Sequence, residues 1–378
     1  MSDSPSTIPL GTRYYFGLEA QLRRTVEHLA MSVFNGWSYE EITTPTVDYY
    51  NLFERGMGRL EAQRAFRFTD VDGRLLALRP DVTSSIARAV ATLMAKRKRP
   101  LRFCYAAPVF RLRGESHADW RRESTQIGCE LIGSNRTAAD MEVLAIASEI
   151  FSCLGLDGSY TITINDLELF NGVAESLELD SAAREEMRQL VDAHNAPDLK
   201  RFLADHAADE GQAFTQLVQL SGKGEVIDEA RPLVTNYRSR AALERLELLW
   251  RIIESLGLSN HFEIDLGDVS RLDYYTGIVF KIYIAGAGSR VGSGGRYDQL
   301  TASFGKAEPA VGFVLDLDAL ADAFRSVNKD ELLTGEEAKK VLPLSHEDPA
   351  TLFREALRRR AQKECIVLAS KEVTACQT

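Results

Sequence analysis

Two carboxylates, an amide and a pair of tyrosines are the side chains of this sequence best suited to hold a small polar ligand. Gln126 and Glu130 lie four residues apart in a predicted strand, so their side chains point to the same face. Asp81 supplies a second carboxylate, and Tyr274 and Tyr275 supply hydroxyl groups on aromatic rings. An ammonium group needs carboxylate and amide oxygens around it, whereas an imidazole needs an acceptor, a hydroxyl and an aromatic wall. The set therefore suits an amino-acid pocket. The alternative is a salt-bridged strand carboxylate beside ordinary sheet aromatics.

The elements that must position these residues are strands and helices in separate blocks. Apolar residues from Leu18 to Phe34 recur at helical spacing, and Gly36 ends this predicted helix. Further helices are predicted over 84–96, over 138–154 (amphipathic), after Tyr297 and near Leu315. Strands are predicted in the hairpin 64–79 and over 102–113, 121–133, 159–166, 261–266, 274–284 and 289–294. Many antiparallel strands with helices in separate blocks predict an α+β fold rather than a doubly wound sheet.

A change of pattern near residue 168 indicates how the chain is divided. From 168 to 256 the alternation disappears and charged helical segments dominate, which predicts a helical insertion between two strands of one sheet. We therefore predict one core domain over 1–325. Residues 326–378 open with a polar linker, and their strand, helix and strand patterns lie at 341–344, 349–362 and 365–368. This tail predicts a short C-terminal βαβ-like remnant.

Composition and charge are those of an ordinary globular chain. Hydrophobic residues make up 45% and charged residues 26% of the 378 residues. The sequence has neither an apolar run of membrane-spanning length nor a signal-peptide pattern, so we expect a cytoplasmic protein without a membrane partner. A net charge of −10 disfavours a nucleic-acid partner, and the basic runs 96–99 and 358–360 would be solvated helix ends or a partner contact. Five cysteines without a C-x-x-C pair and six scattered histidines predict neither disulfides nor a metal site.

Four motifs in order resemble the histidyl type of class II aminoacyl-tRNA synthetases. They are Leu78–Thr83, Pro108–Arg111 with Gln126–Glu130, Leu272–Phe280 and Gly294–Asp298. The resemblance covers most of residues 8–325, and the paired tyrosines of the third motif are specific to the histidyl type. It implies a class II synthetase-like antiparallel sheet flanked by helices, and a dimer interface around Pro45. The alternative reading is that Pro45 merely ends a strand. The glycines of 292–295 lack the ending of a phosphate loop, so we expect a tight turn between strands there.

The resemblance also implies a histidine pocket. In the family, the residues matching Asp81, Thr83 and Gln126 hold the ammonium group of the amino acid. Those matching Glu130 and Tyr275 hold its imidazole. Because Asp81 stands where the family usually has a glutamate, its contact with the ammonium group would be longer or bridged by water. The histidine-binding residues implied in this way are Asp81, Thr83, Arg111, Gln126, Glu130, Tyr274 and Tyr275. No cofactor is implied.

The ATP side of the pocket departs from the family. Ala319 stands where an arginine neutralises the ATP phosphates, Asp316 where the family has a glycine, and Asp318 where it has a glutamate. A glutamate, a phenylalanine and an arginine of the activation machinery fall at Arg113, Ser124 and Ser270. The loss of one preorganised charge-stabilising donor costs about 2.7–4 kcal/mol of transition-state stabilisation. We therefore expect no catalysis, unless another arginine such as Arg296 restored these roles.

A synthetase core without its activation residues, followed by a shortened tail, is similar to the regulatory subunits of ATP phosphoribosyltransferase. That resemblance implies a non-catalytic subunit that binds and activates the short-form catalytic chain in the first step of histidine biosynthesis. The implied partners are this chain in a hetero-octamer, a second copy as a self-dimer, and histidine as the effector. Two other interpretations stay open: a divergent histidyl-tRNA synthetase, and a stand-alone histidine-sensing or RNA-binding module.

Overall fold

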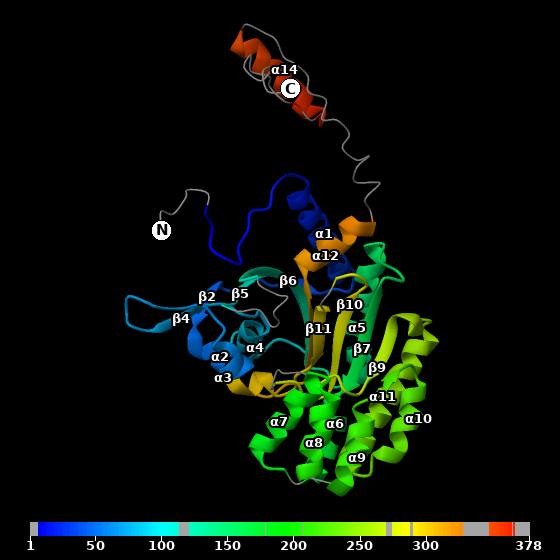
Figure 1. The fold of residues 1–378 in the computed structure, drawn as a ribbon. Helices are drawn as coiled ribbons and strands as arrows, with labels where there is room; N and C mark the ends of the chain where they lie inside the picture. The colour runs from blue at the N-terminus through cyan, green and yellow to red at the C-terminus, as the bar shows by residue number, and fades with distance from the viewer. Residues whose placement is uncertain are drawn as a thin grey trace. The chain divides into compact units, whose positions relative to one another are not determined.

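A mostly antiparallel sheet is the centre of the fold. The computed structural model describes residues 7–112, 121–177, 179–206, 208–269, 274–287, 290–327, 348–364 and 366. Nine of the described strands form this sheet, in the order β1-β5-β6-β12-β11-β10-β7-β9-β8 (Figure 1). Their bounds are β1 Glu40–Glu41, β5 Leu101–Phe110, β6 Glu123–Ile132, β7 Tyr160–Asp166, β8 Ser221–Gly222, β9 Phe262–Asp265, β10 Ile278–Ile284, β11 Arg290–Arg296 and β12 Ala310–Asp316. With helices on its faces, the sheet confirms the predicted α+β class.

Helix α1 (Gly17–Gly36) packs on one face of the sheet, against β5 and β6. Its buried residues Leu22, Val26, Ala30 and Val33 recur every three or four positions, which is the spacing that predicted the helix. Trp37 caps its C-terminal end, as the sequence indicated.

Helix α5 (Thr137–Cys153) packs between α1, the sheet and a third helix, α11 (Tyr237–Ser255). We predicted an amphipathic helix over 138–154. The range agrees with α5 to within one residue at each end, but the helix is buried on more sides than an amphipathic helix would be. Nine residues of α5 are buried, and they lie around most of its circumference. Its partners on several sides leave little of the helix facing water.

The opposite face of β5 is covered by α4 (Thr83–Ala91) and the short 3-10 helix η3 (Leu300–Phe304). We predicted this helix over 84–96, but α4 ends at Ala91, five residues earlier. After Ala91 the chain turns. The Arg99 guanidinium donates hydrogen bonds to the backbone oxygens of Met94 at 3.0 Å and Arg97 at 2.6 Å. The Met94 oxygen also accepts from the Arg97 backbone N–H at 3.0 Å, so the chain continues in turns and not as a longer helix.

The segment between β7 and β9 is mostly helical and also contains the two-residue strand β8. β7 and β9 are parallel neighbours in the sheet, so the helices form one long crossover between them. Their buried side chains belong to the same hydrophobic core as α1, α5 and the sheet. Besides α11, the helices are α6 Leu167–Ser176, α7 Ser181–Asp192, α8 Ala196–His206, α9 Ala208–Leu217 and α10 Glu225–Ala230.

A second, three-stranded sheet of β2 (Val47–Tyr49), β4 (Leu75–Leu78) and β3 (Arg67–Thr69) lies beside helices α2 (Tyr50–Met57) and α3 (Arg59–Ala62). One face packs inward through Ala77, which is fully buried. Val47, Tyr49 and Phe68 point to the other face by the pairing of the strands, and all three are exposed. Pro45, which precedes β2, is exposed as well.

The chain divides into two compact units, Met1–Phe324 and Arg325–Thr378. In the second unit the structure describes helix α14 (Pro349–Ala361), whose N-terminus is capped by the Asp348 carboxylate. The strand predicted over 341–344 lies outside the described residues, as does most of the strand predicted over 365–368.

Candidate functional site

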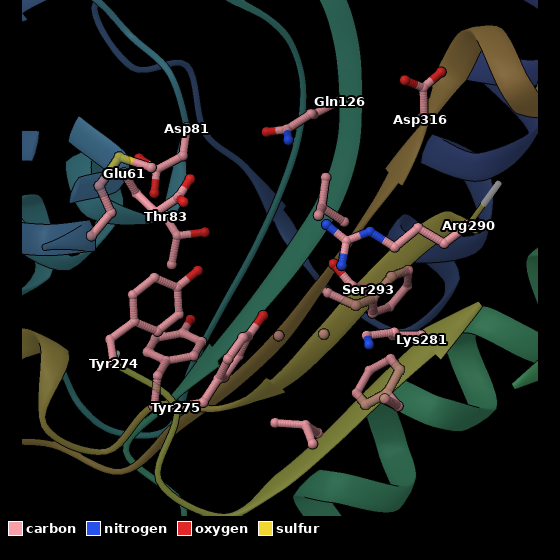
Figure 2. A pocket seen from close by; sticks show the side chains of 18 of the residues that line it. Glu61, Asp81, Thr83, Gln126, Tyr274, Tyr275, Lys281, Arg290, Ser293 and Asp316 are labelled. Carbon is pink, nitrogen blue, oxygen red and sulfur yellow. The ribbon is translucent and has the colours of Figure 1, made fainter. Parts of the chain in front are cut away.

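A cavity of about 390 Å³ opens on the face of the sheet opposite α5, over strands β6, β12, β11 and β10 (Figure 2). Small-molecule sites in proteins commonly have volumes of about 300–1,000 Å³. The cavity brings together all of the residues implied as histidine-binding. These are Asp81, Thr83, Arg111, Gln126, Glu130, Tyr274 and Tyr275. Pro45 is not among the lining residues.

The deepest polar group of the cavity is the Glu130 carboxylate, which is only 2% exposed. It accepts hydrogen bonds from Thr83 Oγ1 at 2.7 Å and from the Tyr105 hydroxyl at 3.4 Å. A third hydrogen bond comes from the Tyr297 hydroxyl. Tyr105 and Tyr297 did not emerge from the sequence as site residues, although Tyr297 belongs to the fourth motif. Three donors on one carboxylate hold it in a fixed position at the end of the cavity.

Space for this carboxylate comes from a glycine on the neighbouring strand. Gly312 of β12 pairs directly with Glu130 of β6. A Cβ atom added at Gly312 would overlap Glu130 Oε2 and the backbone oxygen of Cys129. Gly294 of β11 likewise leaves room for the ring of Phe280. The expected tight turn over 292–295 is wrong: these glycines lie inside β11, where they let side chains of neighbouring strands lie flat on the sheet.

Burial raises the pKa of two acidic groups of the cavity, Glu130 and Asp81. The pKa of Glu130 rises to about 7, because removal from water outweighs the hydrogen bonds from Tyr297 and Thr83, and nearby Asp81 adds repulsion. The pKa of Asp81 is raised by burial as well, against a 3.0 Å hydrogen bond from Ser84 Oγ. A cation bound between these groups would favour their charged forms.

Tyrosines form the aromatic wall of the cavity. The ring centroids of Tyr274 and Tyr275 lie 4.8 Å apart, and Tyr274 meets Tyr297 edge to face at 5.8 Å. Both Tyr274 and Tyr275 precede β10, so the strand predicted over 274–284 begins four residues later, at Ile278. The backbone outside the ladder lets two consecutive side chains line one cavity, whereas strand neighbours would point to opposite faces.

Carboxylates stand at the other end of the cavity, where the family resemblance places ATP. Asp316 and Ala319 both line it, and Asp316 Oδ1 accepts from the Ala319 backbone N–H at 2.9 Å (Figure 2). Asp318 is fully buried, forms an ion pair with Arg23 and lies 3.2 Å from the Arg121 guanidinium. Arg121 is also 3.6 Å from Asp316. Arg23 and Arg121 therefore face carboxylates of the chain itself.

Of the described residues, Arg296 and Ser124 do not line the cavity and so supply no substitute for the activation residues. Arg296, the arginine considered as a replacement, is bound to Asp140 Oδ1 at 3.0 Å through Nε and to the Ser134 backbone oxygen at 3.1 Å. It therefore ties β11 to α5. Ser124 lies on β6 and does not line the cavity. Arg113 and Ser270 lie outside the described residues.

The described residues also bear on metal binding and on membrane insertion. They contain no group of three or more His, Cys, Asp or Glu side chains that could hold a metal ion. Among the helices described, none is long and apolar enough to cross a membrane. In the basic run 96–99, Arg97 pairs with Glu40 at 2.6 Å and Arg99 with Glu308 at 2.5 Å. These pairs reduce the positive field that a nucleic acid would need.

Comparisons with known proteins agree with this geometry. The sequence profile of the histidyl-tRNA synthetase family matches residues 13–320. An ATP phosphoribosyltransferase regulatory subunit of Clostridium kluyveri is 34% identical over 317 residues, which is 83% of this chain and 81% of the relative. One of Moorella thermoacetica is 34% identical over 373 residues, 97% of this chain and 93% of the relative. A crystal structure of an ATP phosphoribosyltransferase regulatory subunit/histidyl-tRNA synthetase from Bacillus halodurans aligns with a TM-score of 0.83 and 26% identity, over 100% of this chain and 96% of that one.

Proposed function

The chain belongs to the ATP phosphoribosyltransferase regulatory subunits, which share the fold of histidyl-tRNA synthetase, and from this premise we propose what its cavity does. The chain binds and activates a short-form catalytic chain in the first step of histidine biosynthesis, and it takes part in feedback by histidine. It carries out no catalysis itself. The observation behind this proposal is the cavity, because its amino-acid end is fully built while carboxylates stand where ATP would bind.

Histidine is the ligand that the amino-acid end supports best. Glu130 offers a fixed, buried acceptor for an imidazole N–H, and the tyrosines beside it offer an aromatic face. Asp81 supplies a carboxylate for the ammonium group. Gln126, four residues before Glu130 on β6, lines the same cavity and adds an amide oxygen. An imidazole N–H and the ammonium group of histidine would thus each have a complementary group in the cavity.

Electrostatics at the other end argue against amino-acid activation. Asp316 faces the cavity, and a phosphate group about 4 Å away would be repelled by roughly 1–4 kcal/mol, depending on the effective dielectric constant. Ala319 cannot offset this repulsion. Arg23 and Arg121 are drawn to the buried Asp318 carboxylate. In this region the carboxylates of Asp316 and Asp318 take the place that ATP phosphates would occupy beside the arginines.

Assembly completes the proposal. The exposed apolar face of the three-stranded sheet, formed by Val47, Tyr49 and Phe68 next to Pro45, is the surface that we assign to the self-dimer. A twofold contact would use the same face of both copies. Dimers of this kind would combine with catalytic chains into a hetero-octamer. Histidine would act through a coupling free energy between the cavity and the catalytic chain, typically of 1–3 kcal/mol.

Calorimetry of histidine binding to the assembled complex tests the site. Glu130→Gln should weaken binding, since a neutral acceptor replaces a charged one. Asp81→Asn should weaken it through loss of the charge facing the ammonium group. Tyr275→Phe should have a smaller effect, because one neutral hydrogen bond is worth about 0.5–1.5 kcal/mol. Glu244→Gln, an exposed position on α11, is the matched control for Glu130→Gln.

The pattern across these variants decides the outcome. We expect the control to bind like the unmodified chain, while Glu130→Gln and Asp81→Asn lose most of the affinity. Histidine binding that is unchanged by the two substitutions together would place the ligand elsewhere. The cavity would then be only an inherited shape.

A further inference from the structure

Several cationic groups line the cavity, and of these the sequence implied only Arg111 as a site residue. Arg290 is the first residue of β11, and its side chain extends into the cavity from the side opposite Asp81 and Thr83 (Figure 2). Arg111, after β5, and Arg64, after α3, line the same cavity. Three guanidinium groups from distant parts of the chain therefore meet in one space of about 390 Å³.

These cations lie near enough to one another to interact. The pKa of Arg290 falls to about 10, because protein atoms surround the guanidinium group and because Arg111 and Arg64 repel its charge, while Glu61 offsets part of this effect. Arg290 nevertheless remains cationic at neutral pH, and part of its side chain is exposed to solvent. Arg111 is held in place by a 2.9 Å hydrogen bond from its Nε to the Pro80 backbone oxygen. An anion bound between these groups would offset their repulsion.

Charged groups of both signs line the cavity, including Asp316 and Lys281. Asp81 and Glu130 lie at one side, and Arg290 enters from the other. A free α-amino acid is a zwitterion whose ammonium and carboxylate groups diverge from one carbon atom. An amino acid held at its ammonium end by Asp81 turns its carboxylate away from that acidic group. The guanidinium fork matches a carboxylate with two parallel hydrogen bonds.

We propose that Arg290 binds the α-carboxylate of the amino acid held in this cavity, with Arg111 as the oriented neighbouring cation. This inference rests on the proposed function, which supplies histidine as the ligand. It makes Arg290 the residue that distinguishes an amino acid from an amine of the same side chain. Inorganic phosphate has the same anionic chemistry, so it serves as the competing probe.

Paired ligands and paired variants test the proposal by calorimetry on the full chain in complex with the catalytic chain. The ligands are histidine and histidinol, which has the same imidazole and ammonium groups but no carboxylate. The variants are Arg290→Gln, Arg290→Lys and, as a control, Arg251→Gln at an exposed position of α11. A charge-assisted hydrogen bond is worth about 1.5–3 kcal/mol, so Arg290→Gln should raise the Kd for histidine by about ten- to hundredfold.

Histidinol affinity should stay within about threefold of its original value in Arg290→Gln, which is within the scatter of unrelated surface substitutions. The Kd for histidine in Arg290→Lys should lie between those of the unmodified chain and Arg290→Gln, since lysine keeps the charge but lacks the two parallel donors of the guanidinium group. Arg251→Gln should leave the Kd values of both ligands unchanged. An equal effect of Arg290→Gln on histidine and histidinol would overturn the proposal, as would no effect on either.

The outcome separates this proposal from the function on which it rests. If Glu130→Gln abolishes histidine binding while Arg290→Gln leaves it intact, the histidine site stands and the role of Arg290 is wrong. If the unmodified complex binds no histidine, both fall together. Displacement of inorganic phosphate by histidine in the unmodified complex, lost in Arg290→Gln, would support a shared anion position. If phosphate binding depends on Arg290 but histidine does not displace the phosphate, the proposal that Arg290 binds the histidine carboxylate is contradicted.

Discussion

The buried Glu130 carboxyl group should make the stability of the protein depend on pH in a way that one substitution removes. Its pKa is about 7 in the folded chain, against 4.5 for an ordinary glutamic acid. The folded state therefore keeps a proton that the unfolded chain releases. Between about pH 4.5 and pH 7 the folded state binds more protons than the unfolded state, so the free energy of unfolding falls as the pH rises.

The size of this effect follows from the two pKa values. Each pKa unit corresponds to about 1.4 kcal/mol, so the full loss is about 3 kcal/mol once the pH exceeds about 7. From about pH 5 to about pH 8 the loss amounts to roughly 2–3 kcal/mol. Glu130→Gln cannot ionise, and its amide oxygen can still accept from Thr83 and Tyr297. Asp81 remains in both proteins, and its repulsion of the Glu130 charge is part of the difference that the comparison measures.

Urea unfolding of the unmodified chain and of Glu130→Gln, at several pH values over this range, measures the difference. We expect Glu130→Gln to gain stability relative to the unmodified chain by roughly 2–3 kcal/mol as the pH rises from about 5 to about 8. Glu244→Gln should run parallel to the unmodified chain. Parallel curves for Glu130→Gln as well would refute the claim that this carboxyl group is held protonated by burial.

Three further predictions concern packing, catalysis and assembly. Gly312→Ala should destabilise the chain by about 1–3 kcal/mol in urea unfolding, because the new methyl group overlaps the Glu130 carboxylate; Gly36→Ala, whose added Cβ meets nothing, should not. ATP–pyrophosphate exchange with histidine should stay at the no-protein background, and histidine-dependent exchange would contradict the absence of catalysis. Light scattering of the isolated chain should give twice the chain mass of 42.1 kDa. Phe68→Asp should shift this mass toward the monomer while Leu256→Asp leaves it unchanged, and equal effects would place the dimer contact elsewhere.

Much of the fold follows from short-range patterns in the sequence. The apolar spacing that predicts α1 and the residue types that predict the long strands β5 and β6 involve only neighbours along the chain. The extensive burial of α5 and the strand conformation of 292–295 did not follow from such patterns. The first depends on how many partners surround a helix, and the second on which side chains cross the backbone of β11. Neither property is encoded within the segment itself.

The site shows the same division. The carboxylate, amide and tyrosine residues could be collected from motifs, and they do line one cavity. Gly312 became meaningful only through its pairing with Glu130, which lies far away in the sequence. Arg290 follows no motif and enters the cavity because β11 lies between β12 and β10. Strand order and register, which place such residues, are properties of the folded sheet and not of any local pattern.

The most direct test of a regulatory role is the rate of the short-form catalytic chain, measured with increasing amounts of this chain, with and without histidine. We expect a saturable increase in rate as the complex forms, and a further change in that rate when histidine is added. Glu130→Gln should keep the activation and lose most of the response to histidine at subsaturating concentration. A catalytic rate that is the same with and without this chain, at concentrations where the two proteins elute together, would contradict the account.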